Sequence, residues 1–112
     1  MEFAALIDRG LAIRQLLEEH ERRTYGRPWS LEEVALGMVG DVGDLAKLIQ
    51  GWEGVREVED VRTRLEHELA DVLWSIIVIA ARCEIDLETS FVRTMDEIEE
   101  SLNESGLAPS AE

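Results

Sequence analysis

Apolar residues recur along the chain at intervals of three and four, which is the spacing of one face of an α-helix and not the alternating spacing of a strand. Loops that contain glycine or proline separate four such stretches. Ser30 and Glu33 have the spacing of a capping box before the second stretch, and Asp86 can cap the fourth. The pattern predicts an all-α protein whose helices cover about residues 2–23, 31–50, 61–83 and 87–102.

We expect the four helices to form one bundle-like domain at residues 1–102, because a chain of 112 residues can bury an ordinary core without disulfides. The last residues, 103–112, are expected to form a disordered C-terminal tail. The fourth helix should turn one apolar stripe inward. The members of this stripe are Leu87, Phe91, Met95, Ile98 and Leu102.

The third predicted helix is apolar on almost every side from Val72 onward. A helix with this pattern is buried all round. In so short a chain, three other helices cannot easily cover that much apolar surface. We therefore expect this segment to lie in the interface of an oligomer.

The charge balance narrows the possible partners and the expected location. Eleven Lys and Arg residues against 25 Asp and Glu residues give a net charge of −14, and no basic run interrupts it. Such a surface repels phosphodiester backbones and anionic lipid headgroups, so we expect no nucleic-acid polymer and no membrane surface as a partner. Cys83 cannot form an internal disulfide, and the first residues lack the order of a signal peptide, so the expected location is the cytoplasm.

Two pairs of carboxylates stand three residues apart, Asp41 with Asp44 on the second predicted helix and Glu68 with Asp71 on the third. Both pairs flank their apolar stripes at about −60° and −120°, at 100° per residue. If the two helices pack stripe to stripe, four carboxylates converge at one edge of the core. Oxygen ligands without a paired His favour Mg²⁺ or Mn²⁺. Chance pairing on solvated faces is the alternative in so acidic a chain, and spacing alone leaves both open.

Three glycines lie inside the second predicted helix: Gly37, Gly40 and Gly43. Each lowers helix stability by up to about 1 kcal/mol relative to Ala, so something close to the backbone should compensate. We interpret them as the site of a close helix crossing. Such a crossing would also bring the two acidic pairs near enough to share metal ions.

Three segments carry a family resemblance: Val39-Gly-Asp-Val-Gly-Asp-Leu-Ala, His67-Glu-Leu-Ala-Asp-Val-Leu-Trp and Ile85-Asp-Leu-Glu. Over about residues 28–102 the chain resembles the all-alpha nucleoside triphosphate pyrophosphohydrolases, the MazG-like superfamily, and within it the small dCTP pyrophosphatase-like branch. The resemblance implies a MazG-type fold that assembles as a homodimer or homotetramer.

The same resemblance implies an activity. It is hydrolysis of a nucleoside or deoxynucleoside triphosphate between its α and β phosphates, giving a monophosphate and pyrophosphate, with nucleotide-pool cleansing as the biological role. The implied cofactor is Mg²⁺, held by Asp41, Asp44, Glu68 and Asp71.

The chain departs from this family at three places. Asp replaces Glu at both acids of the first motif, which shortens the reach of each by roughly 1.5 Å. Gly40 stands where some members carry an additional Glu, so no residue is assigned as the base that activates water. Thr94 and Ile98 replace the Lys and Asn of dCTP-type members. These departures keep an alternative open, namely a non-catalytic helical interaction or regulatory module that binds metal or nucleotide.

Four residues are weaker candidates for substrate binding. Arg64 lies about one turn before Glu68 on the same flank and Arg82 lies farther along it, so either could meet a phosphate, although surface positions are commoner for such residues. Arg93 is adjacent to the position of the missing Lys. Trp52, predicted in the loop after the second helix, could stack on a nucleobase.

Overall fold

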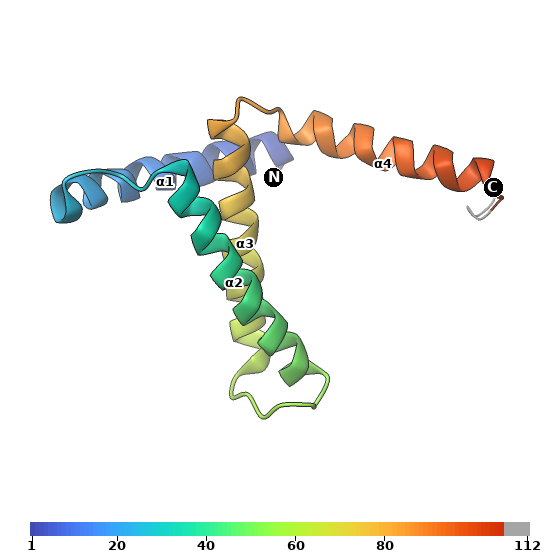
Figure 1. The fold of residues 1–112 in the computed structure, drawn as a ribbon, viewed down its shortest axis with the longest axis horizontal. Coiled ribbons are helices and arrows are strands. Elements are labelled where there is room, and N and C mark those ends of the chain that lie inside the picture. The colour runs from blue at the N-terminus through green and yellow to red at the C-terminus, as the bar shows by residue number, and fades with distance from the viewer. Residues whose placement is uncertain (107–112) are drawn as a thin grey trace.

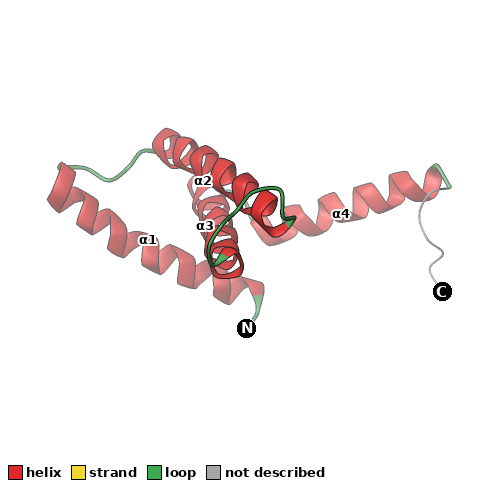
Figure 2. Ribbon diagram, turned by 90° about the horizontal axis from the view of Figure 1, so that it is seen from below, coloured by secondary structure: helices red, strands yellow, loops and turns green. Residues whose placement is uncertain are grey.

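The structure, a computed structural model, describes residues 1–106 and consists of four α-helices (Figure 1). No strand occurs in this part of the chain (Figure 2). The predicted all-α fold is therefore confirmed, and every helix ends within two residues of its predicted bound. The helices are α1 (Phe3–Tyr25), α2 (Leu31–Trp52), α3 (Val61–Arg82) and α4 (Leu87–Glu104).

Local hydrogen bonds explain where the helices begin. At the start of α2, the Ser30 hydroxyl accepts from the Glu33 backbone N–H at 3.2 Å, and the Glu33 carboxylate accepts from the Ser30 N–H at 3.0 Å. Hydrogen bonds from Arg27 and from the Ser30 backbone lower the pKa of Glu33 to about 2. The Asp86 carboxylate accepts from the Thr89 N–H at 3.1 Å and caps α4 in the same way.

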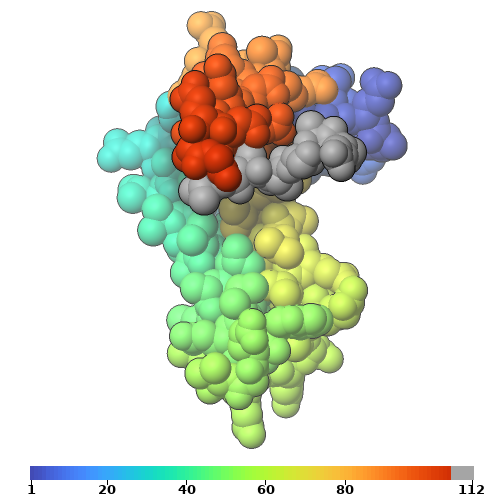
Figure 3. All heavy atoms as spheres, turned by 90° about the vertical axis from the view of Figure 1, so that its right-hand side faces the viewer, coloured from blue at the N-terminus to red at the C-terminus, as the bar shows by residue number. Residues whose placement is uncertain are grey.

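Helix α3 is the centre of the packing, because both α1 and α2 pack against it. Helices α2 and α3 lie side by side as an antiparallel hairpin, and α1 crosses one end of it (Figures 1 and 2). At the other end the loop turns back onto α2, because Gly51 has no side chain: a Cβ there would lie 2.7 Å from Cγ2 of Val58. The loop end of the hairpin projects away from α4 (Figure 3).

A network of ion pairs and hydrogen bonds attaches α1 to the rest of the fold. Arg14 and Glu21 are 7% and 3% exposed and pair at 2.6 Å, and the Glu21 carboxylate also accepts from the Trp29 backbone N–H at 2.8 Å. Arg82 at the end of α3 donates to the Trp29 carbonyl and pairs with Glu18, both at 2.8 Å. The network therefore fixes α1, the α1–α2 connection and α3 relative to one another.

The apolar core of the described residues is small. Its buried members are Val34, Leu48, Ile77, Val78 and Ala80. The chain exposes 8629 Å² of surface, against about 6,200 Å² for a compact monomer of its mass. Its radius of gyration is 17.8 Å, against about 13 Å for a compact domain of this length. A single chain thus leaves much apolar surface uncovered.

Helix α4 corrects one expectation. Its stripe has the predicted periodicity, but the stripe does not face inward: Phe91, Ile98 and Leu102 are 61%, 49% and 39% exposed. After the turn at Glu84, which has φ 57°, α4 extends away from the other three helices (Figure 1). The pattern identified a face suited to burial, and this chain supplies no helix to cover it.

The C-terminal expectation is corrected in part. Asn103 and Glu104 belong to α4 and not to a tail, while 107–112 lie outside the described residues. None of the described helices combines the length and apolar character that crossing a bilayer requires.

The buried Arg14–Glu21 pair generates a stability prediction. We expect Glu21→Ala to lower the free energy of unfolding by about 3 kcal/mol, because the substitution leaves the Arg14 charge buried without its closest partner. Urea denaturation at one fixed protein concentration measures the change. Glu19→Ala is the matched control, since Glu19 is half exposed and pairs only with exposed arginines of α1. Equal losses in the two variants would contradict the interpretation.

Candidate metal centre

Three carboxylates converge across the α2–α3 hairpin: Asp41 and Asp44 from α2, and Glu68 from α3. One carboxylate oxygen from each lies within 4.8 Å of the other two. Oxygens on opposite sides of a Mg²⁺ ion lie about 4.2 Å apart, twice the metal–oxygen bond length, so small side-chain rotations would bring all three onto one ion. The arrangement fits a hard divalent cation.

Glu68 is the most strongly perturbed member of the cluster. Its Oε1 atom is buried and has no hydrogen-bond partner among the described residues. Burial, followed by the negative charges of Asp41, Asp44 and Asp71, raises the pKa of Glu68 above its ordinary value of 4.5. A cation between these side chains would remove both penalties, because it would coordinate the orphaned oxygen and offset the repulsion.

The fourth predicted ligand lies beside the cluster rather than in it. Asp71 Oδ2 pairs with His67 Nε2 at 3.1 Å, one turn back along α3. Asp71 is still close enough to raise the pKa of Glu68. The structure therefore brings three of the four predicted ligands together and leaves the fourth paired with His67.

The interpretation of the α2 glycines as a close helix crossing is wrong for this chain. A Cβ added at Gly40 or Gly43 would meet nothing within 4 Å, and one at Gly37 would make an ordinary contact of 3.6 Å with the Trp29 ring. These glycines do not lie in the contact with α3. The carboxylates meet because α2 packs against α3, and this packing does not depend on the missing side chains of Gly40 and Gly43.

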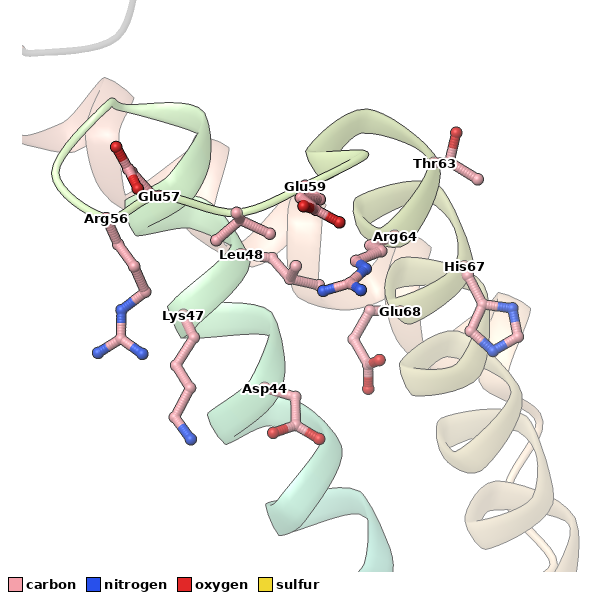
Figure 4. A pocket seen from close by; sticks show the side chains of 11 residues that line it. Asp44, Lys47, Leu48, Arg56, Glu57, Glu59, Thr63, Arg64, His67 and Glu68 are labelled. Carbon is pink, nitrogen blue, oxygen red and sulfur yellow. The ribbon is translucent and has the colours of Figure 1, made fainter.

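Two cavities adjoin the carboxylates. The larger, about 810 Å³, opens toward the α2–α3 loop and is lined by Asp44 and Glu68 together with Lys47, Arg56 and Arg64 (Figure 4). The smaller, about 180 Å³, includes Asp41 and Asp71 in its lining. Its other walls include Arg14, Leu17, Trp29, Val34, Trp74 and Val78. The acidic residues thus separate a cavity rich in charge from one rich in aromatic and apolar surface.

Of the four weaker candidates, the structure brings only Arg64 to the carboxylates. Arg82 is eleven residues beyond Asp71, roughly 16 Å along α3, and is held by Glu18. Arg93 lies on α4 in a shallow surface hollow. Trp52 is the last residue of α2 and not a loop residue, and its ring faces the Arg62 guanidinium at 6.0 Å.

Sequence reasoning missed several cavity residues. Lys47 follows Asp44 by three positions, so helical spacing alone could have placed it on the acidic flank. Residue spacing could not have identified Arg56, because it lies in a loop. Nor could it have identified Trp29 and Trp74, which line the smaller cavity from distant segments of the chain. Trp74 also donates a hydrogen bond to the Gly10 carbonyl at 2.9 Å, which ties this wall to α1.

The raised pKa of Glu68 predicts how pH affects the metal-free protein. Between pH 4.5 and the raised value, the folded state binds more protons than the unfolded state, so the free energy of unfolding falls as pH rises through this window. Glu68→Gln imitates the protonated side chain. We therefore expect the variant to be more stable than wild type at pH 7 and equal to it at pH 4, in urea denaturation with a chelator present.

Glu66→Gln is the control, because Glu66 lies on the same helix with a side chain that is 69% exposed. It should show little difference from wild type at any pH. If Glu68→Gln gave no gain at pH 7, the carboxylates would not be crowded in solution as they are in the structure.

Known proteins similar to this chain were found among dCTP pyrophosphatases. Rat dCTP pyrophosphatase 1 (Rattus norvegicus) is 39% identical over 67 residues, the human protein (Homo sapiens) 39% over 71, and the bovine protein (Bos taurus) 37% over 67. Each match takes in 54% of this chain but only 39% of the relative's length. No family model and no solved structure matches the chain. The resemblance to the dCTP pyrophosphatase-like branch of the MazG-like, all-helical pyrophosphohydrolases is nevertheless confirmed over about half of the chain.

Proposed function

We propose that the chain is a Mg²⁺-dependent nucleoside triphosphate pyrophosphohydrolase, which also accepts Mn²⁺, and that it serves to cleanse nucleotide pools. The observation that carries the proposal is the convergence of Asp41, Asp44 and Glu68 beside a cavity of about 810 Å³. This volume lies in the range of small-molecule sites. The similarity to proteins named dCTP pyrophosphatase supports the reaction and makes dCTP the first substrate to test.

Asp41, Asp44 and Glu68 would hold the cation, and Asp71 would join them on release from His67. The bound ion would offset charge on the phosphate oxygens and lower the pKa of water. In the reaction, the water oxygen forms a bond to the α phosphorus, the bond from that phosphorus to the bridging oxygen breaks, and pyrophosphate leaves with the electron pair. One proton of the water is released.

The nucleoside has a suitable place in the smaller cavity. Its volume of about 180 Å³ is below that of typical small-molecule sites and accommodates only part of a nucleotide. Trp29 and Trp74 offer aromatic surface for stacking a nucleobase, and the buried Arg14 guanidinium offers N–H donors. We therefore assign base contact to these residues in place of Trp52.

We also propose that the chain assembles as a homodimer or homotetramer, and the uncovered apolar surface supports this. The exposed stripe of α4 and the outer face of α3, where Leu69 and Leu73 are 52% and 43% exposed, are the surfaces that a second copy would cover. Contiguous exposed apolar patches commonly mark interaction sites on protein surfaces. Burial of these apolar side chains against a second copy would enlarge the small apolar core of the single chain.

The ligand assignment predicts loss of activity. We expect Glu68→Gln and Asp71→Asn each to lower Mg²⁺-dependent pyrophosphate release from dCTP and other triphosphates by at least about 100-fold, while the helical circular dichroism persists. Glu66→Gln serves as the control and should retain wild-type turnover. Unchanged turnover in both ligand variants would exclude this site. Metal binding by wild type without any turnover would favour the non-catalytic module.

The proposed assembly predicts that charged residues introduced into the apolar stripe of α4 will dissociate the oligomer. We expect the wild-type chain to sediment with the mass of two or four copies, and Phe91→Glu combined with Ile98→Glu to sediment as a monomer, because both side chains would bring charge into the interface. Glu100→Gln, on the opposite side of α4, should leave the mass unchanged. A wild-type chain that is monomeric at micromolar concentration would contradict the proposal.

A further inference from the structure

The basic side chains of this acidic protein fall into two groups. Within residues 1–106, six of the 11 pair with carboxylates: Arg14, Arg22, Arg23, Arg27, Arg62 and Arg82. Five form no such pair with a described residue, and three of these five, Lys47, Arg56 and Arg64, line the larger of the two cavities that adjoin the carboxylates. In a chain with a net charge of −14, unpaired cations gathered at one place need a physical reason.

Helix geometry sets these cations on one side of the carboxylates. Lys47 follows Asp44 by three residues on α2, and Arg64 precedes Glu68 by four on α3. Because the helices are antiparallel, both displacements run toward the α2–α3 loop. Figure 4 shows the Arg64 guanidinium reaching from α3 toward α2 beside Glu68, with Lys47 beside Asp44 and Arg56 descending from the loop.

The basic side chains and the carboxylates line the same cavity but form no ion pairs with one another. No described carboxylate lies within ion-pairing distance of Lys47, Arg56 or Arg64, although Asp44 and Glu68 are one helical turn away. Three positive groups and four carboxylates, counting Glu57 and Glu59, line this space. A ligand that carries anionic oxygens together with a divalent cation would satisfy both sets at once.

We propose that Lys47 and Arg64, assisted by Arg56, bind the two terminal phosphates of the substrate, so that pyrophosphate departs toward the α2–α3 loop. This inference rests on the proposed function, whose reaction places a growing negative charge on pyrophosphate. Arg64 offers paired N–H donors and Lys47 a mobile ammonium, and both stabilise phosphate oxygens. Since the lining is net negative without a divalent cation, pyrophosphate should bind only when Mg²⁺ is present.

Binding of inorganic pyrophosphate, measured by titration calorimetry with and without Mg²⁺, tests the inference on the full chain. In Mg²⁺, the combined variant Lys47→Gln and Arg64→Gln should bind pyrophosphate at least tenfold more weakly than wild type. Arg9→Gln combined with Arg23→Gln is the matched control, since it removes the same charge from exposed positions of α1 and should stay within twofold of wild type. The conservative variant Arg64→Lys should retain most of the affinity.

The readouts separate this inference from the proposed function. Equal pyrophosphate affinity in the two double variants, or no Mg²⁺-dependent binding by wild type, would overturn the inference even if the enzyme turns over. Loss of binding in the cavity variant alone would support it even if no triphosphate is hydrolysed. Mg²⁺ alone should raise the melting temperature of every variant by the same amount. If the double cavity variant loses both this effect and its helical circular dichroism, Arg64→Gln alone takes its place.

Discussion

The packing of α2 against α3 forces like charges together, and the rest of the site is arranged around that contact. Val34 and Leu48 are the buried residues of α2, while Val42 and Ile49 of the same helix stay 46% and 45% exposed. The packing of α2 against α3 also brings Asp41, Asp44 and Glu68 together. Burial, and after it the repulsion by Asp41, Asp44 and Asp71, raises the pKa of Glu68, whose Oε1 atom is buried without a hydrogen-bond partner among the described residues. A fold that keeps such a contact is suited to holding a cation there, because the ion converts a destabilising contact into a stabilising one.

The helices around this contact differ in how firmly they are attached: α1 is held by ion pairs, whereas α4 extends away from the other helices. Buried charge pairs hold α1 and the α1–α2 connection against α3, and they also form the wall of the smaller cavity through Arg14 and Trp29. Helix α4 makes no comparable packing with the other described helices. The carboxylates of α2 and α3 and the exposed apolar stripe of α4 therefore lie on separate parts of the described chain (Figure 1).

The sequence predicted what depends on neighbouring residues and missed what depends on distant ones. Helix bounds, the Ser30–Glu33 capping box and the shared side of Asp41, Asp44 and Glu68 follow from residue spacing along a helix, which is a local property. The position of Arg82 could not be predicted, because its partners Glu18 and Trp29 are 64 and 53 positions away. The prediction of a close helix crossing at the α2 glycines was wrong for a related reason. Their spacing shows that one face of the helix lacks side chains, but it does not show whether another helix approaches that face.

Gly51 has a consequence for how the larger cavity is maintained. Because Val58 packs where a Cβ would otherwise stand, the loop is braced against the end of α2 by its own apolar contacts. The backbone N–H of Arg56, two residues before Val58, donates to the Gln50 carbonyl at 3.3 Å, which also holds this part of the loop at the end of α2. The rim of the cavity is consequently preorganised, and a ligand that enters it need not order the loop before it can be held.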